Sequence, residues 1–247
     1  MSTHGDLFIA CNRAGSAPVS HFQVFGERRS GTNFAEQLFE RNLTAKRVDS
    51  YGWKHGVPAM PFIQHDGLIV VVIREAFDWL GSLHNRPFAA SHGDLEFSEF
   101  LRREWYEKYR PGHFGHKDRF GKIAKGPEVA NQVDRHPITG KRFQNVLELR
   151  TVKAQAFLGF VNRECNAVVL RYSDLSKRPG EVVTAVAETF GMALKTPEVK
   201  PVERVGPKGF SEKRLRKEDL SAEDIAFVQE NLDRDFELEM GFASTFA

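Results

Sequence analysis

Hydrophobic residues along this chain switch between short continuous runs and a helical spacing. Three apolar runs have the length and the β-branched content of buried strands: residues 22–25, 68–73 and 167–170. Hydrophobic residues at intervals of three and four positions predict four helices: one that begins near Thr32, one after Arg74, one around residues 147–160, and one around residues 182–190 with Gly191 as its C-terminal cap. Because strands alternate with helices, we expect a three-layer α/β/α fold with a mainly parallel central sheet.

Residues 111–142 interrupt this alternation. The segment is rich in Gly, Pro, His, Lys and Arg and shows little periodicity. A long irregular stretch inside a compact domain is usually functional or disordered, and we interpret this one as a loop or lid on the acceptor side of a site. No stretch has the composition of a linker, so the 247 residues, 41% of them hydrophobic, are expected to form a single domain, 1–247.

Composition argues against several classes of protein. The 35 basic and 33 acidic residues give a formal charge of +2, which is too balanced for a protein that coats nucleic acid. Cys11 and Cys165 have no metal-ligand spacing and are expected to be free thiols in a reducing compartment. The longest apolar run, 68–73, is far shorter than the roughly 20 residues that cross a bilayer, and no basic run precedes the N-terminal apolar patch. We therefore expect a cytoplasmic protein without a signal peptide or membrane span.

A short apolar strand, a doubly basic turn and a helical pattern follow one another near the N-terminus. The turn and the start of the helix read Gly26-Glu27-Arg28-Arg29-Ser30-Gly31-Thr32-Asn33-Phe34. A helix N-terminus favours an anion through its unpaired N–H groups and its dipole, and glycines let the backbone approach the ligand. We therefore predict a P-loop-like phosphate-binding loop. It departs from the nucleotide-hydrolase fingerprint, because Thr32-Asn33 replaces Lys-Ser/Thr and the positive charge lies earlier, at Arg28 and Arg29.

A further basic residue follows the buried strand 68–73. Arg74 stands where the strand ends, and Ser82 lies about two turns into the next helix. Open α/β sheets bind ligands at the carboxyl ends of their strands, and the planar fork of an Arg suits a phosphate. A P-loop hydrolase normally has an Asp there to hold magnesium, which an Arg would repel. Arg74 therefore favours phosphate binding and argues against an ATPase or GTPase.

Together these residues resemble the sulfotransferases that use 3′-phosphoadenosine 5′-phosphosulfate (PAPS). Residues 29–34 resemble the loop with which that family holds the 5′-phosphosulfate. Arg74 and Ser82, eight positions apart, match the Arg and Ser that hold the 3′-phosphate. Residues 170–175 resemble the strand-ending Arg-Tyr-Glu-Asp-Leu segment of the family, and residues 145–153 are similar to a stretch of bacterial members. The resemblance extends over most of the chain, and it implies the P-loop sulfotransferase fold with PAPS as the sulfuryl donor.

The resemblance also implies which residues bind the donor. They are Arg28, Arg29, Ser30, Gly31, Thr32, Asn33 and Phe34 in the loop, Arg74 and Ser82 at the 3′-phosphate, Tyr172 near the adenine, and Lys208 with Gly209 as a second clasp on the 3′-phosphate. In the last pair the Arg that often precedes it in the family is replaced by Pro207.

The catalytic residues depart from the family pattern. Most members have a Lys where this chain has Arg29, which stabilises charge on the leaving oxygen but does not readily donate a proton. Lys54 is the candidate to take the role of the missing loop Lys. The stretch around Lys54 and His55 loosely resembles a Lys-x-His-x-Pro element of the family, which implies His55 as the general base. The rival bases are Glu75, Asp78 and His84.

These observations predict an enzyme, a PAPS-dependent sulfotransferase that acts by in-line displacement and without a metal. Its acceptor would be a hydroxyl or amine of a carbohydrate or small molecule, and its nucleotide product 3′,5′-phosphoadenosine (PAP). The alternatives are a P-loop nucleoside kinase or NTPase, and a nucleotide-binding module that does not catalyse. The identity of the acceptor and the oligomeric state stay open.

Overall fold

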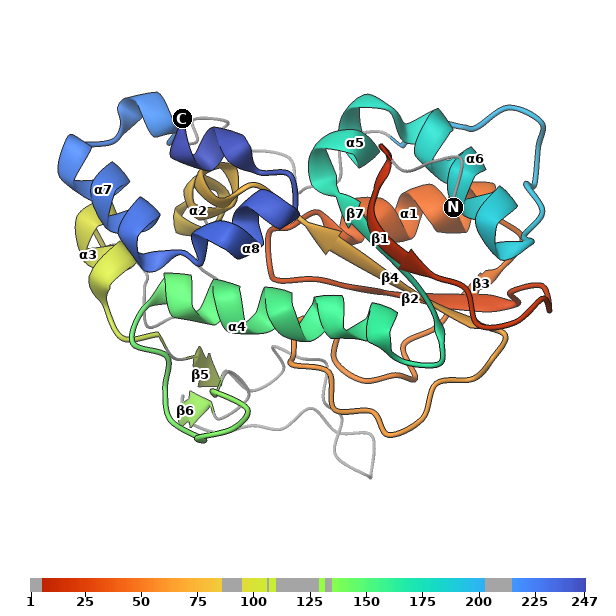
Figure 1. The fold of residues 1–247 in the computed structure, drawn as a ribbon, viewed down its shortest axis with the longest axis horizontal. Coiled ribbons are helices and arrows are strands. Elements are labelled where there is room, and N and C mark those ends of the chain that lie inside the picture. Colours follow the sequence, from red (N-terminus) through yellow and green to blue (C-terminus); the bar gives the residue numbers. More distant parts are fainter. Residues whose placement is uncertain (1–5, 86–94, 106, 110–128, 132–134, 203–214) are drawn as a thin grey trace.

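The computed structural model describes residues 6–85, 95–105, 107–109, 129–131, 135–202 and 215–247. A five-stranded sheet lies at its centre, in the strand order β1-β7-β4-β2-β3 (Figure 1). The strands are β1 (Phe8–Asn12), β2 (His21–Phe25), β3 (Lys46–Arg47), β4 (Gly67–Ile73) and β7 (Asn166–Arg171). Four of them run parallel, whereas β1 pairs antiparallel with β7. The protein therefore has an α/β fold with a mainly parallel, open sheet.

Strand β4 is buried along its whole length, between β2 and β7. Its side chains alternate between the two faces of the sheet, as the pleat of a strand requires. Leu68, Val70 and Val72 belong to the hydrophobic cluster that contains α1 (Thr32–Asn42) and α6 (Pro179–Phe190). Ile69, Val71 and Ile73 belong to the cluster on the opposite face, which contains the second half of α4 (Val146–Leu158). Helices therefore cover both faces of this strand (Figure 1).

A second group of helices extends the molecule beyond the end of the sheet where β4 leads into α2 (Figure 1). Its hydrophobic cluster joins the first half of α4 to three other helices, α2 (Ala76–His84), α3 (Phe97–Arg102) and α7 (Ala222–Asn231). The remaining elements are β5 (Glu107–Tyr109), β6 (Val129–Asn131), α5 (Tyr172–Lys177), α8 (Arg234–Glu239), and the 3-10 helices η2 (Gly159–Asn162), η3 (Lys217–Asp219) and η4 (Ala243–Phe246).

The observed elements confirm the predicted mainly parallel sheet and its three central strands, with ends that differ by at most one residue. Gly191 ends α6 with a left-handed φ of 63°, as predicted. Three details differ from the prediction. The N-terminal apolar patch is the antiparallel strand β1, the short helix α5 comes between β7 and α6, and Phe160 lies in η2 instead of α4. In the described part of the chain, no helix has the length and apolar character needed to span a bilayer.

Candidate functional site

Three neighbouring strand ends carry the candidate site. Strands β2, β4 and β7 are parallel, so their carboxyl ends lie along the same edge of the sheet. The chain passes from β2 to β3 on one side and then to β4 on the other, which makes the gap between β2 and β4 a topological switch point. Residues 26–31, Arg74 and Tyr172 follow these three strands directly. The fold thus brings together residues that lie far apart in the sequence, at the place where open α/β sheets bind ligands.

The backbone of residues 26–31 turns sharply between β2 and α1. Gly26, Arg29 and Gly31 all have positive φ angles, of 152°, 68° and 99°. A Cβ on Gly26 would overlap the carbonyl oxygen of Val72, so only glycine fits beside β4. Gly31 is the N-cap of α1 and provides no side-chain hydrogen bond to the helix, in contrast to the caps of α2 and α4. The start of α1 therefore lacks a side-chain cap, and Ser30 and Thr32 are buried beside it.

Arg29, Ser82 and Arg74 form a chain of contacts next to this turn. The Arg29 Nε atom donates to the hydroxyl oxygen and to the carbonyl oxygen of Ser82, at 3.1 Å each. Arg74 Nη1 donates to the carbonyl oxygen of Arg29 at 3.3 Å, and its guanidinium is buried. Asp78 approaches Arg74 at 3.9 Å from an exposed position, so that it offsets the positive charge weakly. Two guanidinium groups and a hydroxyl thus gather at the end of β4.

The aromatic ring of Tyr172 covers Gly31. A Cβ on Gly31 would overlap that ring, and the Arg74 guanidinium lies 4.8 Å from the ring centroid. Phe34 meets Tyr172 edge to face at 6.3 Å and packs partly against the core. Both aromatic residues therefore lie next to the turn.

Arg28 lies deeper than the other residues of the turn. Its guanidinium is 5.1 Å from the ring centroid of Trp53, and its carbonyl oxygen accepts a hydrogen bond from Trp79 Nε1 at 2.8 Å. The residue is buried, with 7% of its surface exposed. These contacts give Arg28 a packing role in addition to its charge.

Lys54 is held against the start of α1. Its Nζ atom donates to Asn33 Oδ1 at 2.6 Å and to both carboxylate oxygens of Glu36, at 2.9 and 2.8 Å. Glu36 is buried, so this ion pair is protected from solvent screening more than a surface pair would be. Lys54 therefore orients Asn33 and adds positive charge beside the first turn of α1.

His55 is fixed by the turn itself. Its Nδ1 atom lies 2.7 Å from the carbonyl oxygen of Gly26. A carbonyl oxygen only accepts, so Nδ1 carries the proton and Nε2 carries the lone pair. Desolvation, with smaller contributions from the positive charges of Arg28, Lys54 and Lys153, lowers the pKa of His55 to about 3. His55 is therefore neutral at pH 7 and offers Nε2 as a proton acceptor.

The three rival bases have other contacts. Glu75 caps α2 by accepting from the backbone N–H of Asp78 and also accepts from Thr245 Oγ1. Asp78 is the weak partner of Arg74 described above. His84 Nε2 lies 2.8 Å from the carbonyl oxygen of Leu95, and its ring packs against phenylalanines of α3. His55, by contrast, is hydrogen-bonded to the turn itself through Gly26.

A buried ion pair that sequence reasoning missed lies under the turn. Lys153 in α4 is completely buried, and its Nζ atom is 2.7 Å from Glu27 Oε2 and 2.9 Å from the carbonyl oxygen of His55. Glu27 Oε1 accepts from the backbone N–H of Arg28 at 2.7 Å. The only signal in the sequence is a Lys among the apolar positions of a predicted helix, and that signal does not name its partner.

Some of the expected residues lie outside the described part of the chain. They are Lys208, Gly209 and most of the segment 111–142, of which only 129–131 and 135–142 are described. Residues 135–142 form turns that lead into α4.

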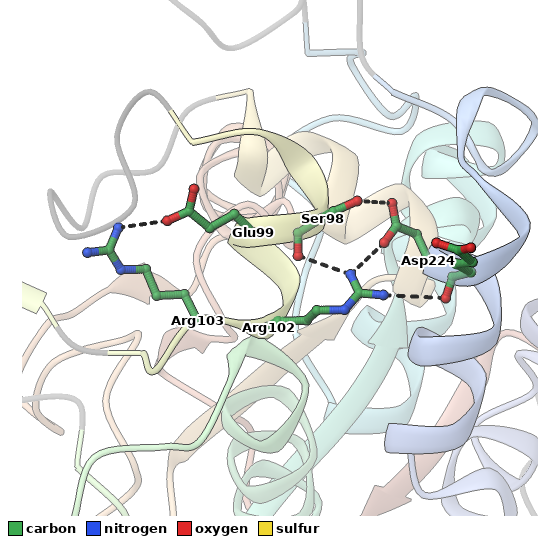
Figure 2. A pocket seen from close by; sticks show the side chains of 6 residues that line it. Ser98, Glu99, Arg102, Arg103 and Asp224 are labelled. Atoms are coloured by element: carbon green, nitrogen blue, oxygen red, sulfur yellow. Dashed lines mark hydrogen bonds and ion pairs between the residues drawn. The ribbon is translucent and has the colours of Figure 1, made fainter.

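Two open surface pockets lie away from the strand ends. One is lined by α3 and α7 and contains Arg102 paired with Asp224, to which Ser98 also donates (Figure 2). The other lies between the start of α4 and the end of α7. The side chains that line the first pocket largely pair with one another, and the second includes Asn145 and Asp233, the N-caps of α4 and α8. Within the described residues, no group of three His, Cys, Asp or Glu side chains is placed to hold a metal ion.

Comparison of the chain with protein-family models, with curated proteins and with solved structures found no match.

Proposed function

We propose that the protein is a PAPS-dependent sulfotransferase. One observation carries the proposal: Arg29, Arg74 and Ser82 are linked by direct contacts at the carboxyl ends of β2 and β4, next to the start of α1, which has no side-chain cap. Arg74 occupies the strand end where a P-loop hydrolase has a metal-binding acid, which favours a donor that is held by guanidinium groups over a magnesium nucleotide.

The donor carries negative charge at its 5′ end and at its 3′-phosphate, and the site offers neighbouring hydrogen-bond donors for both. The start of α1, with Ser30, Thr32 and Asn33, would hold the 5′-phosphosulfate. Arg74 and Ser82 would hold the 3′-phosphate through charge-assisted hydrogen bonds. The rings of Phe34 and Tyr172, next to these groups, would face the adenine. The residues present thus fit the donor in charge and in chemical type.

The reaction would be an in-line displacement at sulfur. The oxygen or nitrogen of the acceptor forms a bond to sulfur, the bond from sulfur to the phosphate oxygen breaks, and PAP leaves with the electron pair. His55 Nε2 would take the proton of the acceptor, because the Gly26 carbonyl oxygen keeps the lone pair on that nitrogen. A bound polyanion raises the pKa of a nearby imidazole, which makes His55 a stronger base once the donor is in place.

Positive charge near the leaving group would stabilise the transition state. Arg29 would stabilise the charge that develops on the leaving phosphate oxygen, and Lys54, fixed by Asn33 and Glu36, adds to the potential at the start of α1. Removal of one preorganised donor of this kind typically lowers kcat by about 10²–10³.

A thermal-shift comparison tests the class of ligand. At about 100 times its Kd a ligand adds about 2.7 kcal/mol to the free energy of unfolding, so PAP should raise Tm by several degrees. ADP, and ATP with magnesium, should raise it less at the same concentration. A larger shift with magnesium ATP, together with ATP turnover, would instead indicate a kinase or NTPase.

Transfer itself requires a second assay. Incubation with PAPS and a panel of phenols, sugars and amines should release PAP in an acceptor-dependent manner. Tight binding of PAP without transfer to any acceptor class would leave a nucleotide-binding module as the better description.

A further inference from the structure

The buried cation of α4 connects two segments of the candidate site. Lys153 Nζ bridges Glu27, in the turn after β2, and the carbonyl oxygen of His55, in the segment that carries the proposed base. Both side chains of the ion pair are buried, Lys153 completely and Glu27 to 8% exposure. A buried charge is tolerated only when it is paired and hydrogen-bonded, and here one ammonium group satisfies both segments.

Glu27 also accepts hydrogen bonds from the backbone of the turn. Its second carboxylate oxygen accepts from the N–H of Arg28, and its carbonyl oxygen accepts from the N–H of Ser30 at 3.1 Å. One residue thus uses its side chain and its main chain to shape the turn that leads into α1.

Two further hydrogen bonds tie the same segments together. The N–H of Gly26 donates to the carbonyl oxygen of Lys54 at 3.0 Å. The carbonyl oxygen of Gly26 accepts from His55 Nδ1. Lys153 therefore lies where the anion-binding turn and the His55 segment meet. It also places one positive and one negative charge, in balance, directly under the proposed anion site.

We propose that Glu27 and Lys153 are a positioning pair, which fixes the turn and His55 relative to each other and keeps the charge beneath the anion site neutral. This inference rests on the proposed function, which supplies the identity of the bound anion. The two residues act through the backbone of the turn and through His55, and they need no contact with the donor.

Two isosteric single variants separate this role from simple stabilisation. Lys153→Met removes the ammonium partner of Glu27 beneath the proposed anion site, so the Kd for PAP should rise by about tenfold or more in calorimetry. Glu27→Gln keeps the acceptor for the Arg28 N–H and removes a negative charge, so the Kd for PAP should not rise. A uniform loss of stability would weaken PAP binding in both variants, so a difference between them separates the two roles.

The double variant completes a double-mutant cycle with the two single variants. Glu27→Gln/Lys153→Met is neutral, so the Kd for PAP should return to within about threefold of wild type, while turnover stays low because His55 has lost the donor to its carbonyl oxygen. If Lys153→Met alone does not fold, the single Glu27→Gln variant and the double variant still carry the test. A Kd raised about tenfold or more by Glu27→Gln would overturn the proposal.

Glu237→Gln is the matched control. Glu237 of α8 forms a buried ion pair, at 2.7 Å, with Arg150 of α4, the helix that also carries Lys153. This variant should lower Tm without changing PAP affinity. Equal changes of affinity in Lys153→Met, Glu27→Gln and Glu237→Gln would reduce the Glu27–Lys153 pair to a stabilising role.

Inorganic pyrophosphate separates this inference from the proposed function. If wild type binds pyrophosphate but not PAP, the sulfotransferase proposal fails. The Kd of each variant is then measured with pyrophosphate, and we expect the same changes in Kd as for PAP. If wild type binds neither, the turn is not an anion site and the positioning role is overturned as well.

Discussion

Arg74 joins three parts of the candidate site through one guanidinium group. It donates to the backbone of the turn at Arg29, lies over the ring of Tyr172 and faces Asp78 at the start of α2. Because it is buried, its charge is screened little by solvent. Under the proposed function, Arg74 distinguishes ligands by the 3′-phosphate.

Arg74→Ala should therefore weaken the binding of PAP far more than that of adenosine 5′-phosphosulfate, which lacks the 3′-phosphate. A charge-assisted hydrogen bond contributes about 1.5–3 kcal/mol, so the Kd for PAP should rise by about 10- to 100-fold in calorimetry. Arg74→Lys keeps the charge without the planar fork and should lie between wild type and Arg74→Ala. Equal losses for both nucleotides would mean that Arg74 supports the turn without holding the 3′-phosphate.

His55 makes the stability of the protein depend on pH. Its pKa is about 3 in the folded protein and about 6.5 when unfolded, so between these values the unfolded chain binds the additional proton. The contribution of His55 to stability is therefore fully present above about pH 6.5 and is lost as the pH falls toward 3.

Between pH 7 and pH 5 this linkage should cost the wild type about 2 kcal/mol of unfolding free energy, measured with urea. His55→Gln, which does not titrate, should lose correspondingly less over the same interval. His65→Gln changes an exposed histidine and serves as the control, with the slope of the wild type. Identical pH slopes for wild type and His55→Gln would contradict the lowered pKa of His55.

At the scale of elements, the turn and α1 are shaped by where glycine is required. Gly31 combines a φ of 99° with a close approach to Tyr172, so a side chain there meets both backbone strain and a ring. Gly15 has a similar φ of 88° and open space around it. The two positions separate the cost of the backbone angle from that of the contact.

Gly15→Ala should lower the unfolding free energy by about 1 kcal/mol, the cost of a strained backbone angle. Gly31→Ala should cost more than that and also weaken PAP binding, because Tyr172 must move away from the start of α1. Thermal unfolding and calorimetry on both variants provide the comparison. Equal stabilities and unchanged PAP binding would show that the ring moves aside without consequence for the site.

Among the elements, the buried strands could be predicted from the sequence, whereas the buried ion pairs and the shortest strand could not. The strands 68–73 and 167–170 were predictable because burial on both faces selects continuous β-branched runs. The pairing of Glu27 with Lys153, and of Lys54 with Glu36, was not, because a periodic pattern indicates that a residue is buried without indicating which distant charge accompanies it. Strand β3 has only two residues, too few for any pattern to indicate it.

At the scale of the whole molecule, the parallel sheet was predictable but its edge was not. The apolar patch at residues 7–11 has the composition of a strand, yet nothing local to it specifies antiparallel pairing with β7. The gathering of Arg74, Tyr172 and residues 26–31 followed from a general rule, since parallel strands place their carboxyl ends together. Their contacts with one another required the coordinates.

The pairing of β1 with β7 also sets the order in which the molecule can be assembled. Phe8 lies opposite Leu170, and Asn12 opposite Ala167, so the first strand of the chain pairs with the last strand of the sheet. During synthesis from the N-terminus, β1 stays without its sheet neighbour, and β4 without one of its two, until residues 166–171 have left the ribosome. Closure of such a long loop carries an entropic cost before any contact rewards it. The edge of the sheet that ends beside Tyr172 is therefore completed late, after β2 has been available for pairing with β4.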